Sequence, residues 1–585
     1  MAEQQIVLRR LSDYPYKSIA LGTTRANLTG RWRYWRPYYQ TRRAPCDAHC
    51  PVGSPAIGFV QAASDGNWER AATMLREENP LAAVTARVCY RPCEAACHRR
   101  QYDAPIAIQA VERVAADQTV EVPAFPAADR PRSVAVVGSG PAGLTFAYYM
   151  AAFGHRVSLF EARRDLGGLL RYGIPPYRLP KVVLDREVER LLAAGIQIRS
   201  DCRLGRDVSL EELEAQYEAV FLAPGASRSL AIRVPGEDTG AVTPGLEFLR
   251  RVHEGGIRGL KGRVAVVGGG NTAIDAARTA LRLGADAVIL YRRSRNEMPA
   301  HVDEIDRAEA EGVQVETLVA PVELQRRGRT VTGLVIRRNE LGAPGPDGRP
   351  VPVPLPGTEE TWPFDLVISA IGEAVDADVA PGLTWGSAGL VVDEWGRTGR
   401  AEVWAAGDVV DMPRTVADAI GRAKRAALLL DARWRGLDPA VMLSRIQVAG
   451  GPAVSMAKYR EALAGQPSSR AEDVVAYDQL NAEFFEPAAP RVALPQLPPG
   501  DGRHSFREVV GTLSAEAAAS EAARCLSCGH CNGCDNCWIY CPDLCVSRES
   551  GHYHIDYDYC KGCTLCVAVC PRGAISTTEE RKWRG

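Results

Sequence analysis

The chain has 585 residues, of which 46% are hydrophobic and 24% are charged, and its formal net charge is −1. At about 150 residues per domain this length suggests about four domains, and the balanced charge gives no general affinity for nucleic acid or an anionic membrane. No stretch approaches the about 20 apolar residues of a membrane span, and residues 1–18 lack the apolar core of a signal peptide. We therefore expect a cytoplasmic protein.

An N-terminal arm, residues 1–43, contains a run rich in aromatic residues and arginine at residues 29–39. Trp, Tyr and Arg are enriched in the hot spots of protein interfaces. This run is therefore either a docking arm for a partner or a strap packed on its own protein.

The cysteines gather near the two ends of the chain. Five lie between Cys46 and Cys97, and 11 lie between Cys525 and Cys570. We assign the first five to a domain that spans residues 44–125. Only Cys202 lies between the two sets. This layout indicates iron–sulfur clusters at both ends, and cluster thiolates fit a reducing compartment.

A dinucleotide-binding motif occupies residues 133–161. An apolar strand, Val134 to Val137, leads into G-x-G-x-x-G and a helix of small residues, and a second strand ends on an acid. The glycines allow the tight turn, the approach of the pyrophosphate and close helix packing, while the acid would hold a ribose hydroxyl. The candidate cofactor residues are Gly138, Gly140, Pro141, Ala142, Gly143 and Glu161.

A second copy of the motif lies at residues 263–293, with Ala273 in the third glycine position. Its second strand ends on two arginines instead of an acid, which favours NADP(H) over NAD(H), because arginine accepts the 2′-phosphate. The alternative is a solvated strand end. The candidate residues are Gly268, Gly270, Asn271, Thr272, Arg292 and Arg293.

Residues 402–430 resemble the closing FAD motif of the two-dinucleotide flavoprotein superfamily, in which Gly407 precedes Asp408 and the acid meets the ribitol. This order implies an FAD domain at residues 131–235 and 375–436, interrupted by an NAD(P)H domain at residues 236–374. The superfamily includes disulfide reductases, but no Cys-x2-Cys or Cys-x4-Cys pair lies between residues 98 and 524, so electrons must leave the flavin by another route.

After a connector at residues 437–510, the segment 511–585 carries the pattern C-x2-C-x2-C-x3-C-P twice. This is the bacterial ferredoxin pattern, in which the fourth cysteine of each run ligates the other run's cluster. Zinc sites are the alternative reading of the thiolates. One [4Fe–4S] cluster would take Cys531, Cys534, Cys537 and Cys570, and the other Cys560, Cys563, Cys566 and Cys541.

Residues 44–436 resemble the glutamate synthase small-subunit family. The matching segments include PCDAHCP at 45–51, NPLAAVTARVCYRPCEAACHRR at 79–100, DLGGLLRYGIPPYRLPK at 165–181 and YRRSRNEMPA at 291–300. The resemblance implies a helical N-terminal domain with two [4Fe–4S] clusters, and a loop at Gly167, Gly168 and Arg171 that wraps the flavin. We name no firm catalytic residue, although Glu304 would lie near the nicotinamide.

The chain departs from this family in one respect, because no cysteine precedes Cys46. The family's missing element resembles SEAARCLSC at residues 520–528, near the other end of the chain. We expect Cys525 and Cys528 to fold back and complete one cluster with Cys46 and Cys97. The resemblance assigns the other cluster to Cys50, Cys89, Cys93 and Glu112.

Four clusters would then be present, leaving Cys202 and Cys545 spare. The alternative is a single N-terminal cluster, with Cys525 and Cys528 unligated or bound to zinc.

We expect a multidomain α/β oxidoreductase in which NAD(P)H gives a hydride to FAD and the clusters accept single electrons. Its partner would be a ferredoxin or a larger redox enzyme, such as a 2-oxoacid oxidoreductase, in a hetero-oligomer. The alternatives are a glutamate synthase small subunit and a non-catalytic electron-wiring subunit.

Overall fold

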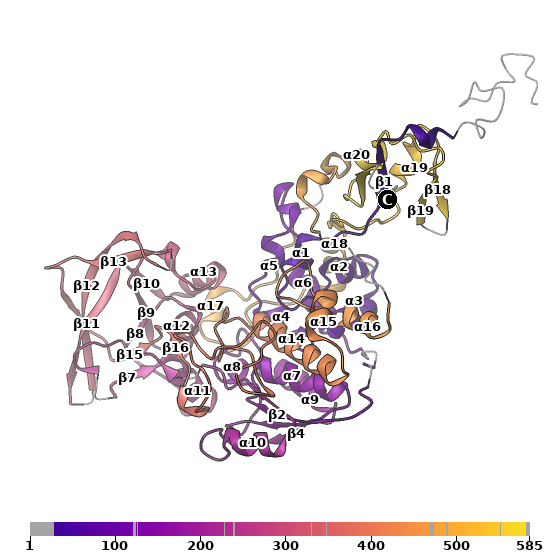
Figure 1. Cartoon of the computed structure of the whole chain (residues 1–585). Coiled ribbons are helices and arrows are strands. Elements are labelled where there is room, and N and C mark those ends of the chain that lie inside the picture. The colour runs from indigo at the N-terminus through magenta and orange to yellow at the C-terminus, as the bar shows by residue number, and fades with distance from the viewer. Residues whose placement is uncertain are drawn as a thin grey trace, which may run out of the picture.

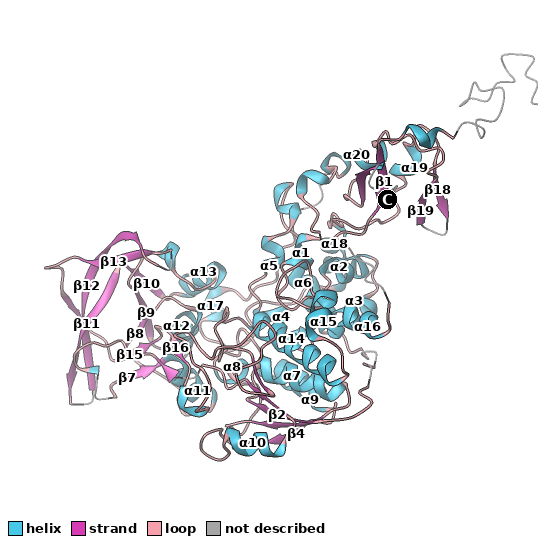
Figure 2. Ribbon diagram, in the orientation of Figure 1, coloured by secondary structure: helices cyan, strands magenta, loops and turns pink. Residues whose placement is uncertain are grey.

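The computed structural model describes residues 28–120, 124–125, 127–226, 228–237, 240–328, 330–346, 348–466, 473–486, 490–549 and 552–580. It shows a multidomain α/β protein with a helical region, two parallel sheets covered by helices, and a small α+β region at one end (Figures 1 and 2). Within these ranges, no helix is both long enough and apolar enough to cross a bilayer.

The helical region carries the first five cysteines. Asn67 caps its longest helix by accepting a hydrogen bond from the backbone N–H of Arg70. A helix from the far end of the chain, α18 (Ala515–Ala523), packs against α2 and α6, so this core is built from both ends of the sequence. The other helices are α1 (Pro45–Ala48), α2 (Ala56–Ser64), α3 (Trp68–Glu78), α4 (Ala82–Val88), α5 (Pro92–Ala95) and α6 (Ile108–Ala116).

The first dinucleotide domain is a five-stranded parallel sheet in the order β17-β5-β2-β3-β4. Its central strands are almost entirely apolar because helices cover both faces. The strands are β2 (Ser133–Val137), β3 (Arg156–Phe160), β4 (Gln197–Arg199), β5 (Ala219–Leu222) and β17 (Val403–Ala405). The helices are α7 (Pro141–Ala152), α8 (Leu169–Tyr172), α9 (Lys181–Leu192), α10 (Leu210–Gln216) and α14 (Val416–Trp434).

The second dinucleotide domain repeats this plan in the order β10-β9-β8-β15-β7. Its main elements are β7 (Val242–Pro244), α11 (Gly245–His253), β8 (Arg263–Val267), α12 (Asn271–Arg282), β9 (Asp286–Tyr291), α13 (Val302–Glu311), β10 (Gln314–Thr317) and β15 (Leu366–Ser369). An antiparallel sheet extends it, made of β11 (Val319–Arg327), β12 (Thr330–Pro344), β13 (Pro350–Pro354) and β14 (Glu360–Trp362). The chain crosses between the two domains through the paired strands β6 (Arg228–Ser229) and β16 (Glu373–Ala374).

A buried carboxylate fastens the helical region to the first dinucleotide domain. Glu78, at the end of α3, accepts hydrogen bonds from Lys424 Nζ of α14 (2.7 Å), from Ser455 Oγ (2.6 Å) and from the backbone N–H of Met456 (2.7 Å). Glu78 and Lys424 are 3% and 0% exposed, so neither charge has water as an alternative partner.

Parts of the connector form helices that pack on the neighbouring regions. Residues 437–466 form α15 (Pro439–Ile446) and α16 (Met456–Leu463), which pack on α14 and α3, respectively. Further along, the short helix α17 (Pro499–Gly502) lies against α13 of the second dinucleotide domain. The connector therefore helps to hold the domains together.

The α+β region consists of α19 (Asn536–Ile539), β18 (Val546–Glu549), β19 (His552–Ile555), α20 (Leu565–Ala568) and β20 (Ile575–Glu579). Strand β1 (Trp35–Tyr39), from the N-terminal arm, pairs antiparallel with β20. Arg33 pairs with Glu580 and donates to the backbone oxygens of Tyr557 and Cys560. Residues 28–43 of the arm are thus a strap on their own protein, while residues 1–27 lie outside the described residues.

Candidate functional site

A cavity of about 1300 Å³ lies between the two parallel sheets and is lined by both glycine motifs. A Cβ atom at Gly138 would lie 2.2 Å from the backbone oxygen of Ala223, and one at Gly268 would lie 2.1 Å from that of Ala370. By contrast, a Cβ at Gly140 would meet no atom within 4 Å. The first glycine of each motif is therefore required by packing, whereas Gly140 leaves backbone open toward a ligand.

Helices α7 and α12 begin directly after Gly140 and Gly270, so the N-terminus of each faces the cavity. The unpaired backbone N–H groups at such an end favour a phosphate. Pro141, Ala142, Asn271 and Thr272 line the cavity in these first turns, while Gly143 packs against the backbone of Gly138 and Ala273 is buried. Both motifs thus have the geometry that a dinucleotide needs.

Glu161 lies at the end of β3, lines the cavity and is 7% exposed. One of its oxygens accepts hydrogen bonds from the backbone N–H and hydroxyl of Ser139, and the other from the N–H of Arg163. The Ser139 hydroxyl also accepts a hydrogen bond from the backbone N–H of Gly167. Ser139, which the motif alone does not single out, therefore joins the acid to the loop that follows it.

That loop crosses over the first motif. Gly168 has φ +51°, and a Cβ there would lie 2.9 Å from Cα of Gly140, so only glycine fits the approach. Gly168 lines the cavity, whereas Gly167 and Arg171 do not. The Arg171 guanidinium pairs with Asp185 and donates to the backbone oxygen of Leu166, and its expected contact with a cofactor stays a prediction.

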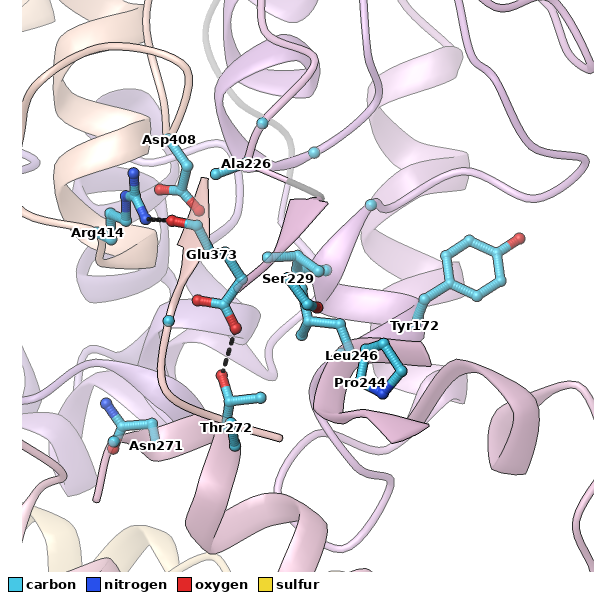
Figure 3. A pocket seen from close by; sticks show the side chains of 18 of the residues that line it. Tyr172, Ala226, Ser229, Pro244, Leu246, Asn271, Thr272, Glu373, Asp408 and Arg414 are labelled. Atoms are coloured by element: carbon cyan, nitrogen blue, oxygen red, sulfur yellow. Dashed lines mark hydrogen bonds between the residues drawn. The ribbon is translucent and has the colours of Figure 1, made fainter. Parts of the chain in front are cut away.

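Two carboxylates that line the cavity lie near each other (Figure 3). Asp408, after Gly407, lies beside Arg414, and Glu373 on the crossing strand accepts a hydrogen bond from Thr272 Oγ1 (3.2 Å). Burial raises the pKa of both acids above their ordinary values, although Arg414 opposes this effect. Glu373 belongs to no motif, and only its place on the crossing strand could have suggested it.

Arginines gather where the second motif's sheet ends. Arg292 is exposed and lines the cavity, as does Arg349 from the start of β13. Arg293 is 6% exposed and donates through Nε to the backbone oxygen of Pro350 (2.7 Å). Both arginines that follow β9 line the cavity, but Arg292 is exposed whereas Arg293 is buried, and Arg349 is an additional cation that no motif marks.

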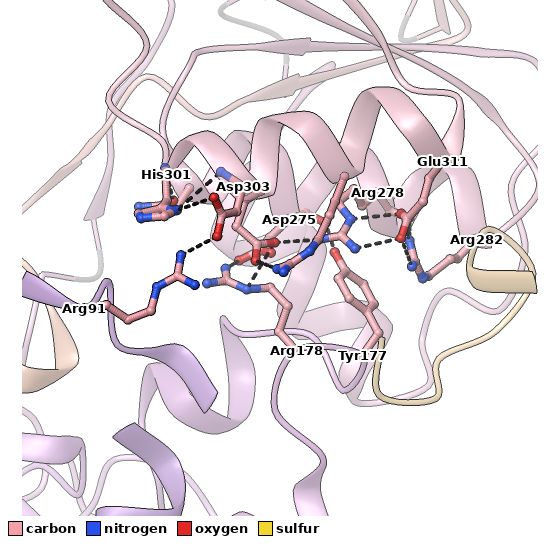
Figure 4. Close-up of polar contacts among 12 residues, drawn as sticks. Arg91, Tyr177, Arg178, Asp275, Arg278, Arg282, His301, Asp303 and Glu311 are labelled. Carbon is pink, nitrogen blue, oxygen red and sulfur yellow. Dashed lines mark hydrogen bonds and ion pairs between the residues drawn. The ribbon is translucent and has the colours of Figure 1, made fainter. Parts of the chain in front are cut away.

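Glu304 is not among the residues that line the cavity, and its expected place near a nicotinamide stays a prediction. Glu304 accepts a hydrogen bond from Arg278 (2.6 Å) and lies 3.6 Å from Arg178. Both arginines belong to a network of ion pairs between domains (Figure 4). Burial alone would raise the pKa of Glu304, but these arginines hold it below its ordinary value. In the same network Arg91 of the helical region pairs with Asp303.

The cysteines form four groups, which we name A to D. Group A is Cys50, Cys89, Cys93 and Glu112, whose charges act on one another. Group B is Cys46, Cys97, Cys525 and Cys528, which line one small pocket with apolar neighbours. Group C is Cys531, Cys534, Cys537 and Cys570, which line another. Group D is Cys541, Cys560, Cys563 and Cys566.

The environment of these thiols fits iron–sulfur ligation. The backbone N–H of Arg91 points at Cys89 Sγ (3.4 Å), and that of Ser527 points at Cys525 Sγ (3.4 Å). Such N–H groups two residues ahead stabilise a thiolate. Within the described ranges no three His, Cys, Asp or Glu side chains converge closely enough to hold a single metal ion. The thiols of groups B and C surround a space instead, as a cube with iron at four corners requires.

Glu112 takes the fourth position of group A and accepts a hydrogen bond from Thr85 Oγ1 (2.9 Å). Its desolvation raises the pKa of the carboxyl to about 7. Of the two cysteines expected to be spare, Cys545 is buried with its Sγ 3.4 Å from that of Cys541 in group D, and Cys202 lines the dinucleotide cavity. No sequence pattern had indicated the place of either cysteine.

The groups follow one another away from the cavity. Tyr90, next to Cys89 of group A, lines the cavity itself. Groups A and B share the segments 46–50 and 93–97, and groups C and D share 537–541 and 566–570. Between B and C the chain runs only from Cys528 to Cys531, and Gly529 N–H donates to the backbone oxygen of Arg572 (2.6 Å). The order is therefore cavity, A, B, C, D.

Three families match consecutive parts of the chain. Residues 38–123 match the family described as "Dihydroprymidine dehydrogenase domain II, 4Fe-4S cluster". Residues 132–423 match the pyridine nucleotide-disulphide oxidoreductase family. Residues 553–576 match the 4Fe-4S binding domain family. The last match contains Cys560, Cys563, Cys566 and Cys570 and favours iron–sulfur ligation over zinc for these thiolates.

Three curated relatives extend these matches. The NADP(+)-dependent formate dehydrogenase subunit beta of Moorella thermoacetica is 37% identical over 83% of this chain and 70% of its own length. The NADPH-Fe(3+) oxidoreductase subunit beta of Geobacter sulfurreducens is 38% identical, and the chain spans 63% of its length. The glutamate synthase [NADPH] small chain of Azospirillum brasilense is 35% identical over 65% of this chain and 84% of its own. This chain therefore belongs to the glutamate synthase small-subunit-like family of oxidoreductases and is an iron–sulfur flavoprotein.

Proposed function

We propose that this protein carries electrons between NADPH and a larger redox enzyme through one FAD and four [4Fe–4S] clusters, one in each of groups A to D. The observation that supports this most directly is the unbroken series of thiol groups that begins at the dinucleotide cavity. The flavin would take a hydride from NADPH and release its two electrons one at a time, as single-electron clusters require.

The residues that would hold the dinucleotides follow from the cavity. The backbone at Gly140 and the N-terminus of α7 would bind the FAD pyrophosphate, with Glu161 at its ribose. The N-terminus of α12 would bind the NADPH pyrophosphate, and Arg292 its 2′-phosphate. No acid or base of the chain is needed for hydride transfer, so the protein's part is to position the two rings and exclude water.

The far end of the series is suited to a partner. Cys563 of group D is exposed, and exposed apolar side chains surround this region at Trp538, Ile539 and Leu544, with exposed fractions of 46%, 62% and 78%. Large apolar side chains in such number on a surface are typical of an interaction site. We infer that a catalytic subunit of the partner enzyme docks here, and that this assembly works in the reducing cytoplasm.

Iron and flavin content of the anaerobically purified chain test the proposal. We expect one FAD and about 16 iron atoms per chain, four for each cluster, and reduction of a viologen dye by NADPH. Cys525→Ser should lose about four iron atoms, with Cys202→Ser as the control that loses none. Unchanged iron in Cys525→Ser would refute four clusters.

Two other functions give different results in the same experiments. A non-catalytic wiring subunit would lack flavin or fail to reduce the dye. A glutamate synthase small subunit would support glutamine-dependent glutamate formation when mixed with a large subunit of that enzyme.

A further inference from the structure

Arg572 is a buried cation at the junction of groups B and C. It follows Cys570 by two residues and is 8% exposed. Its Nε and Nη1 have no hydrogen-bond partner, and no carboxylate of the described residues forms an ion pair with it. A buried guanidinium with unbonded N–H groups is costly unless negative charge lies close by.

The charge that surrounds Arg572 comes from thiols. Cys531, Cys534 and Cys570 of group C line the same pocket as the guanidinium. From the other side, Cys525 and Cys528 of group B are close enough for their charge to act on it. Every cysteine named here belongs to one of the two groups, so the cation stands between them.

The rest of the surroundings holds this side chain in place. The guanidinium lies over the rings of Phe484 and Phe485, 5.8 and 5.3 Å from their centroids. Its backbone oxygen accepts the hydrogen bond from Gly529, in the turn that joins the two groups. The position is therefore fixed by contacts that do not use the free N–H groups.

We propose that Arg572 is the electrostatic link between the clusters of groups B and C, donating its free N–H groups to cluster sulfur and raising the reduction potentials of both clusters. This inference rests on the proposed function, since it requires both clusters. A fixed positive charge stabilises the form of a cluster that carries the additional electron, and hydrogen bonds to sulfur act in the same direction. Arginine stays protonated in proteins, so the effect does not depend on pH.

The test is a reductive titration of the full chain, followed by electron paramagnetic resonance, for the wild type, Arg572→Gln, Arg572→Lys and Arg548→Gln. The last is the matched control, because it removes an exposed arginine of the same region that pairs with Asp535 at the surface. We expect two of the four cluster signals to move to lower potential in Arg572→Gln and to stay in place in the other two variants.

Each other outcome is also decisive. If Arg572→Gln contains the full iron and all potentials match the wild type, or if all four signals move together, the proposal is wrong. If Arg572→Gln loses iron while Arg572→Lys keeps both iron and potentials, a positive charge is required and the proposal stands. Loss of iron in both variants would mean a purely structural role. The iron content and reducibility of the wild type test the proposed function separately.

Discussion

Arg292 offers a direct test of how the cavity selects its nicotinamide cofactor. Arg292 is exposed and lines the cavity just after β9. It occupies the position of the motif at which a side chain contacts the 2′-phosphate of NADPH. We expect Arg292→Ala to raise the KM for NADPH and to leave the KM for NADH unchanged, because NADH has no 2′-phosphate.

The expected size follows from the exposure of the side chain. Hydrogen bonds to a charged group contribute about 1.5–3 kcal/mol, and an exposed arginine belongs at the lower end of that range because water and salt screen it. About 1.4 kcal/mol corresponds to tenfold, so KM for NADPH should rise about tenfold. The additional cation Arg349 keeps the loss from being larger.

The assay is anaerobic viologen reduction with each nucleotide, at low and at high salt. Arg295→Ala is the matched control, because this neighbouring arginine pairs with Asp306 and Glu309 and does not line the cavity. An equal rise of KM for NADPH and NADH, or no change for either, would show that Arg292 does not read the 2′-phosphate.

Two further predictions concern stability. Burial raises the pKa of Glu373 above its ordinary value of 4.5, so the folded state binds the proton of this carboxyl more tightly than the unfolded state does. The free energy of unfolding should therefore fall as the pH rises above about 4.5. Glu373→Gln, which keeps an acceptor for Thr272, should therefore have a higher Tm than the wild type at pH 8, with a smaller gap at pH 4; a gap independent of pH would contradict this. Lys424→Met leaves the buried charge of Glu78 unpaired and should destabilise the fold by about 3–5 kcal/mol. The measurement is the urea concentration at which the flavin is released, which should be lower than for the wild type. Arg460→Met, which removes a more exposed ion pair, should cost less than about 1 kcal/mol, and equal effects of the two would refute the role of the buried pair.

The parts of this site that could be predicted from sequence are those fixed by short-range geometry. A glycine such as Gly138 is dictated by the turn between one strand and the next helix, and the spacing of Cys531, Cys534 and Cys537 is the spacing that a loop around one cluster requires. Glu304 and Arg171 could not be placed in this way, because their partners lie on other elements of the fold: Arg178 and Arg278 for Glu304, and Asp185 of α9 for Arg171. The same holds for Arg349, which reaches the cavity because the start of β13 lies against Arg293, where Arg293 Nε donates to the backbone oxygen of Pro350.

One feature of the fold has a consequence for biosynthesis. Group B takes Cys46 and Cys97 from the helical region but Cys525 and Cys528 from beyond the two dinucleotide domains, and α18 fills part of the same core. Domains generally fold from the N-terminus during synthesis, yet this one lacks half of a cluster site until more than 500 residues have left the ribosome. A chain that ended before Cys525 would keep group A and the dinucleotide cavity but would lack half of group B and all of groups C and D, so the proposed electron path would stop at group A.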